Sequence, residues 1–138
     1  MILYLDTTGF EVALKLFDNQ GKLCAELFWA SAYNQSEELL EKIDGLLREK
    51  AVNQKSLDAI VVNPGPGSFT GVRIGVTTAN FLAYGLNIPV LGLNLTEAGT
   101  IGTNSLESIL AEKFWRQPVL PTYGQPPRIT TGRTRFGP

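Results

Sequence analysis

The sequence contains no histidine and only one cysteine, Cys24. Without histidine, a Ser-His-Asp triad, a histidine general base and a His-ligated zinc site are excluded. A single cysteine excludes an intrachain disulfide and a cysteine-cluster metal site. Because Cys24 lies in the apolar segment 23–30, we expect a buried and unreactive thiol.

Long apolar runs are also missing. None reaches the roughly 18 residues that a membrane-spanning helix needs, and the first residues lack the basic region that is typical of a signal peptide. We therefore predict a cytoplasmic protein without a membrane segment.

The residues that are present are typical of one globular domain. The 138 residues are 43% hydrophobic and 18% charged, with a net charge of −1. A chain of this length can bury a core, and we do not expect a large two-lobed enzyme. The charge is uneven, since residues 113–138 hold five Lys or Arg and no acid. We interpret this region as a solvated tail that packs on an acidic body, with direct RNA contact as the less favoured alternative.

Hydrophobic periodicity predicts five strands, and helices between and after them. An antiparallel meander followed by β-α units implies an α/β fold, a mixed five-stranded sheet with helices on its faces. We expect this domain to cover residues 1–115 and the Pro-rich residues 116–138 to form a separate basic tail. Strands are predicted at 2–6, 11–17, 22–30, 57–63 and 88–93, and helices at 34–50, 72–87 and 105–115.

The strongest local pattern is a glycine-rich loop between the fourth strand and the second helix. Residues 63–73 read Asn-Pro-Gly-Pro-Gly-Ser-Phe-Thr-Gly-Val-Arg. A P-loop requires Lys after its last glycine, and a dinucleotide fingerprint requires Gly-x-Gly-x-x-Gly, so neither template fits. We interpret the loop as a sharp, closely packed reversal in which a hydroxyl side chain caps the helix. The residues concerned are Gly65, Gly67, Ser68, Thr70 and Gly71.

Small residues recur at four-residue steps along the second predicted helix, at Gly75, Ala79 and Ala83. Small side chains allow another backbone to approach closely. One face of this helix must cover the sheet, so we expect this ridge to receive a second helix. That helix is either 34–50 or one from another chain.

At residues 63–76 the sequence closely resembles the signature of the TsaB (YeaZ) family, bacterial accessory proteins in making threonylcarbamoyladenosine on transfer RNA. Residues 2–8 (ILYLDTT) and 89–95 (PVLGLNL) are similar to that family's first strand and to the strand after its second helix. The resemblance implies a ribonuclease-H-like (actin-like ATPase) lobe. It also implies that most of the family's second lobe, which follows the position of Leu95, is absent here.

The resemblance implies a scaffold without catalytic residues or a metal. Members of the family bind the catalytic paralogue TsaD through the two helices of their N-terminal lobe, and the ATPase TsaE joins the complex. Transfer RNA contact would then be indirect, and a homodimer through the same helices stays open. The implied interface residues are Ser36, Leu39, Leu40, Ile43, Leu47, Arg73, Gly75, Val76, Ala79, Leu82 and Ala83.

The segment Asp6-Thr7-Thr8, at the tip of the first strand, leaves a second function open. In actin-like ATPases the first hairpin holds phosphate or its metal with an Asp and a glycine-rich turn, but here Gly9 follows two threonines. We expect no cofactor for the chain alone. ATP and Mg²⁺ would bind Asp6, Thr7 and Thr8 only at a site shared with a partner, and a nucleotide-binding switch that also uses Gly65–Gly71 is the alternative function. The remaining interpretation is that Asp6, Thr7 and Thr8 bind no nucleotide and only hydrogen-bond a loop.

Overall fold

In a computed structural model of the chain we describe residues 1–31, 35–95 and 117–123. The predicted helix at 105–115 and residues 124–138 of the predicted tail lie outside these ranges. No helix of the described part is long and apolar enough to cross a membrane. The elements are β1 (Ile2–Asp6), β2 (Glu11–Phe17), β3 (Leu23–Ala30), α1 (Gln35–Glu49), a 3₁₀ turn η1 (Gln54–Ser56), β4 (Ala59–Val62), α2 (Phe69–Leu86) and β5 (Val90–Gly92).

The strands form the predicted mixed five-stranded sheet, in the order β3-β2-β1-β4-β5. β1, β2 and β3 make an antiparallel meander. β4 pairs parallel to β1, and β5 pairs parallel to β4. β1 is therefore the central strand, and its carboxyl end at Asp6 lies beside the end of β4, from which the glycine loop starts.

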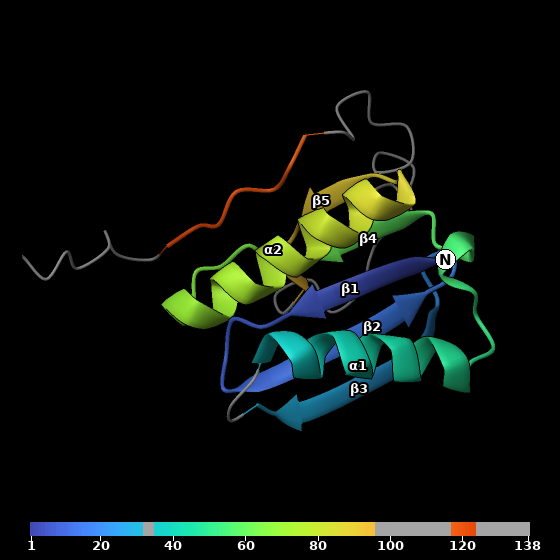
Figure 1. Ribbon diagram of the computed structural model, residues 1–138, viewed down its shortest axis with the longest axis horizontal. Coiled ribbons are helices and arrows are strands. Elements are labelled where there is room, and N and C mark those ends of the chain that lie inside the picture. The colour runs from blue at the N-terminus through green and yellow to red at the C-terminus, as the bar shows by residue number, and fades with distance from the viewer. Residues whose placement is uncertain (32–34, 96–116, 124–138) are drawn as a thin grey trace, which may run out of the picture.

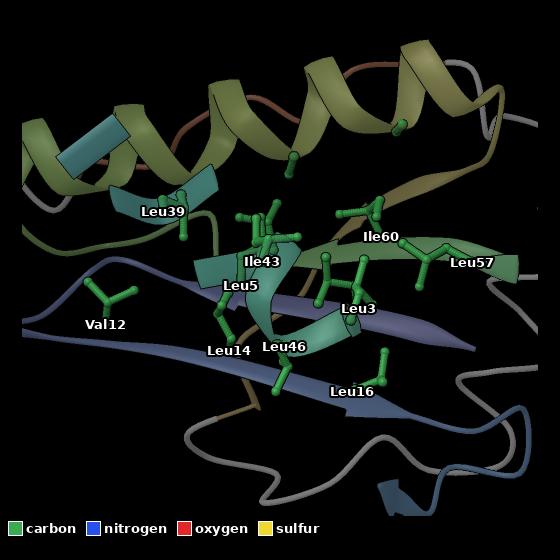
Figure 2. Close-up of a cluster of buried hydrophobic side chains, with 14 of the residues drawn as sticks. Leu3, Leu5, Val12, Leu14, Leu16, Leu39, Ile43, Leu46, Leu57 and Ile60 are labelled. Carbon is green, nitrogen blue, oxygen red and sulfur yellow. The ribbon is translucent and has the colours of Figure 1, made fainter. Parts of the chain in front are cut away.

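Both described helices cover the same face of the sheet (Figure 1). Alternate residues of β1 point to opposite faces, so Leu3 and Leu5 join the core beneath the helices, which Figure 2 shows in close-up. Ile2 and Tyr4 are buried on the other face, in a smaller cluster with Leu95. Because both faces are covered here, the strand is apolar without interruption.

The turn between β2 and β3 forms where the sequence predicts it. The Asp18 carboxylate accepts hydrogen bonds from the backbone N–H of Gln20 at 2.9 Å and of Lys22 at 2.8 Å. Backbone donors, with that of Lys22 foremost, hold the pKa of the Asp18 carboxyl below its usual value. Gly21 has a φ of 88°, a left-handed conformation that glycine adopts without a steric cost.

α2 begins three residues earlier than the sequence predicts. Ser68 is its N-cap, and the Ser68 side chain accepts a hydrogen bond from the N–H of Gly71 at 3.3 Å. Of the two predicted caps, Ser68 is therefore the correct one, and Thr70 lies inside the helix. The cap outweighs the poor helix propensity of Gly71, which the prediction had assigned to the loop.

The expectation of a buried Cys24 is wrong, because the thiol is exposed. β3 is an edge strand, and its neighbour Ala25 points to the helix-covered face, so Cys24 points to the opposite face. At this edge of the sheet the opposite face stays open to solvent.

We expect Cys24 in the native chain to react with an aromatic disulfide reagent at a rate within about tenfold of the unfolded chain, because reactivity follows exposure and thiolate fraction. The reaction can be followed by absorbance with and without denaturant. Labelling that starts only in denaturant would contradict the exposed position.

Candidate functional site

The glycine loop packs directly against the two residues that follow β1. A Cβ on Gly67 would lie 2.5 Å from the carbonyl oxygen of Thr8, and a Cβ on Gly71 would overlap the carbonyl oxygen of Thr7. The Ser68 backbone N–H donates to the Thr8 carbonyl at 2.8 Å. The interpretation of the loop as a closely packed reversal is therefore confirmed.

Asp6 holds the tip of β1 to this loop. Its Oδ1 accepts hydrogen bonds from the Thr8 N–H at 2.9 Å and from the Thr8 hydroxyl at 2.7 Å. Its Oδ2 accepts from Asn63 Nδ2 at 3.0 Å and from the Tyr4 hydroxyl at 3.3 Å. Burial, and then the nearby Asp6 carboxylate, raise the pKa of Tyr4 far above its usual value, so the phenol keeps its proton and donates. Both oxygens of the carboxylate thus have partners within the chain.

Thr7 points away from solvent and into the contact with α2. It is buried, and its hydroxyl donates to the carbonyl oxygen of Gly71. A ligand has no access to this side chain, so the expectation that Thr7 contacts nucleotide is wrong. Asp6 and Thr8 are only partly buried, and a nucleotide shared with a partner at these two residues stays a prediction.

Most of the helix residues expected at a partner surface lie in the core instead. The expectation that the ridge of small residues on α2 could receive a helix of another chain is wrong, because these residues are buried in the core and a Cβ on Gly75 would overlap the Thr7 hydroxyl. Bulky substitutions there would disrupt the fold and would not test an interface. Ser36, Leu40 and Arg73 are exposed and Leu82 is half-buried. The buried residues are Leu39, Ile43, Leu47, Gly75, Val76, Ala79 and Ala83.

A surface groove of about 450 Å³ runs between α1 and α2. Leu40 of α1 is 44% exposed and Phe81 of α2 is 71% exposed. The sequence interpretation missed Phe81, although it lies three and four residues after Thr78 and Thr77, and an aromatic residue beside threonines on one helix face is a signal of an exposed contact. The groove is lined by Ser36, Leu40, Thr70, Arg73, Ile74, Thr77, Thr78 and Phe81.

Comparison with known proteins relates this chain to proteins named for threonylcarbamoyladenosine biosynthesis or threonylcarbamoyl transfer. A family model described as TsaD, tRNA N6-adenosine threonylcarbamoyltransferase, matches residues 30–120. The Bacillus subtilis protein named tRNA threonylcarbamoyladenosine biosynthesis protein TsaB is 31% identical over 113 residues, which are 82% of this chain and 49% of that protein. A Geotalea daltonii protein named tRNA N6-adenosine threonylcarbamoyltransferase is 41% identical over 56 residues, which are 41% of this chain and 16% of that protein.

The fold is similar to solved structures as well. The structure described as YeaZ from Pseudomonas aeruginosa superimposes with a TM-score of 0.62 at 30% identity, over 71% of this chain and 49% of that one. The match spans about half the length of the Bacillus subtilis relative and of this structure. The predicted α/β fold with a mixed five-stranded sheet is therefore confirmed, and it matches this YeaZ structure over the superimposed residues. The chain therefore belongs to the family that the TsaD model describes and, within it, to the TsaB (YeaZ) proteins.

Proposed function

We propose that this chain is a non-catalytic accessory protein in the biosynthesis of threonylcarbamoyladenosine on tRNA in the cytoplasm, and that it binds a TsaD-type transferase through the groove between α1 and α2. The observation that carries the proposal is this groove, with the exposed apolar side chains Leu40 and Phe81 facing it from two helices. Exposed apolar side chains gathered in one groove mark interaction sites. The relatives named for threonylcarbamoyl chemistry support the choice of partner.

The groove has the composition of a helix-docking surface. Leu40 and Phe81 offer apolar contact, and the threonine hydroxyls of α2 offer hydrogen bonds. Among the lining residues that the structure describes, Arg73 supplies the only charge. An amphipathic helix fits such a surface by laying its apolar face into the groove. We expect the partner helix to carry an acidic residue opposite Arg73, since guanidinium groups pair with carboxylates.

The assignment of the chemistry to the partner rests on Asp6. Asp6 already accepts four hydrogen bonds within the chain, and the sequence offers no histidine as a base. In the described ranges, no three His, Cys, Asp or Glu side chains gather in a way that could hold a metal ion. A TsaE-type ATPase and an indirectly contacted tRNA complete the proposed complex.

Replacing Phe81 with glutamate is expected to weaken the complex with a TsaD-type subunit at least about tenfold, because central aromatic side chains commonly contribute 2 kcal/mol or more to an interface. Co-purification of the two co-expressed proteins, followed by calorimetry, measures the change. Phe10→Glu is the matched control, since Phe10 is 85% exposed and is not among the described residues that line the groove.

Full co-purification of the Phe81→Glu chain would contradict the groove as the docking surface. The mass of the isolated chain in solution tests the homodimer, which Phe81→Glu would return to a monomer if it formed through the same groove. Tight binding of ATP and Mg²⁺ by the chain alone, lost in Asp6→Ala, would favour the nucleotide-switch alternative over the scaffold.

A further inference from the structure

Residues 117–123 lie in extended form along α2 and run in the opposite direction to it (Figure 1, in orange). The Asn80 side chain makes two hydrogen bonds with the backbone of Val119, accepting from its N–H at 2.8 Å and donating to its carbonyl at 2.9 Å. Further along, the Thr122 N–H donates to the Pro64 carbonyl at 2.6 Å. The segment is held by its main chain, in the way that a groove holds a bound peptide.

Two glycines, Gly65 and Gly92, form the surface on which this segment packs. A Cβ on Gly65 would overlap the carbonyl oxygen of Thr122, and a Cβ on Gly92 would lie 3.1 Å from a methyl of Val119. Gly65 belongs to the glycine loop and Gly92 ends β5. A side chain at either glycine would therefore crowd the extended segment. For Gly65, this contact is a second role in addition to the reversal of the loop.

The far end of the segment leads to the α1–α2 groove through two ring contacts. Tyr123 stacks on Phe69, with ring centroids 4.7 Å apart and planes inclined by 26°. The Arg73 guanidinium carbon lies 5.5 Å from the centroid of the same Phe69 ring. Since Arg73 also lines the groove, a continuous series of contacts joins the segment to the groove.

We propose that residues 117–123 are a strap that positions Arg73 at the groove, so that docking of the strap and binding of a partner in the groove favour each other. The coupling rests on the proposed function, whereas the positioning of Arg73 does not. When Tyr123 moves away, stacking no longer holds the Phe69 ring in place. The Arg73 guanidinium then no longer has an aromatic ring in a fixed position beside it. Coupling of this kind is reciprocal, so a partner that contacts Arg73 also tightens the strap.

The positioning is tested in the free full-length chain by NMR. In Tyr123→Ala we expect the Arg73 side-chain Nε–H resonance to move toward the value of free arginine. Tyr123→Phe keeps the stack and is expected to leave the Arg73 resonance in place. Tyr84→Ala is expected to leave it in place as well, since it removes an 89% exposed tyrosine from α2, the helix that carries Arg73. An unchanged Arg73 resonance in Tyr123→Ala would overturn the proposal, whether or not a partner binds.

The coupling is tested by amide hydrogen exchange of Val119 and Thr122, whose N–H groups are both hydrogen-bonded in the docked strap. We expect a TsaD-type subunit to slow their exchange, and Tyr123→Ala to weaken its binding roughly 3- to 10-fold, as expected for an aromatic stack. Binding that leaves both exchange rates unchanged would overturn the coupling and leave the proposed function standing. If the native chain binds no such subunit, the proposed function fails and the coupling with it, while the NMR comparison still decides whether the strap positions Arg73.

Discussion

Replacing Gly71 with alanine is expected to lower the free energy of unfolding by about 3 kcal/mol or more, at the upper end for an overpacked core. The new methyl group would overlap the carbonyl oxygen of Thr7 and force the residues after β1 away from α2. The same shift would break the hydrogen bond from the Thr7 hydroxyl to the Gly71 carbonyl. Urea denaturation followed by circular dichroism measures the loss.

Gly85→Ala is the matched control. Gly85 lies in the same helix, and no described residue beyond its chain neighbours and the nearby helix backbone comes within 4 Å of a Cβ built there. Alanine has the higher helix propensity, so this variant is expected to be as stable as the original chain, or more stable by up to about 1 kcal/mol. Equal denaturation midpoints for Gly71→Ala and the original chain would show that the loop has room to move, against the close packing described above.

Replacing Asn63 with alanine is expected to lower the free energy of unfolding by about 2–4 kcal/mol, because it leaves buried polar groups without their partners. Asn63 is only 2% exposed. Its Nδ2 donates to Asp6, and its Oδ1 accepts from the buried N–H of Gly65 at 3.1 Å. The Gly65 N–H would lose a bond that water cannot easily replace, and the partly buried Asp6 carboxylate would lose one of its four. Denaturation curves measure the effect.

Asn53→Ala is the comparison for this variant. Asn53 is exposed, and its Oδ1 accepts from the Lys55 N–H at the start of a 3₁₀ turn. Loss of such a cap is expected to cost about 1 kcal/mol or less. If the two asparagine variants lose equal stability, Asn63 acts only as a local cap, and its bonds to Asp6 and Gly65 contribute little.

The elements that depend on local pattern are those that the sequence predicts well. The alternation of polar and apolar residues predicts β2 with its observed bounds. The turn at 18–21 has the residue types that its conformation needs. β4 is shorter than its predicted range, and α2 starts earlier, because pairing and capping set these ends. The expected burial of Cys24 is wrong because an apolar sequence segment does not show whether it forms an edge strand with one face open to solvent.

The candidate site is predictable only in part, for a physical reason. The need for glycines in the loop can be predicted from their spacing. What they pack against cannot, since Thr7 is 64 residues from Gly71 and Thr122 is similarly far from Gly65. For the same reason the sequence does not show that the small residues of α2 are buried in the core of this chain. Hydrophobicity alone predicts burial of Phe81, whereas its aromatic ring is exposed in the structure.

The position of β1 has a consequence for the order in which the nascent chain can fold. β2 follows within a few residues, but Ile2 pairs with Ala59 on its other side. Ribosomes add about 5–20 residues per second, so the second edge of this apolar central strand waits for seconds before β4 emerges. An unpaired edge of this kind can pair with another chain. Slow codons between α1 and β4 would lengthen that interval and should increase aggregation during synthesis without changing a single residue of the protein.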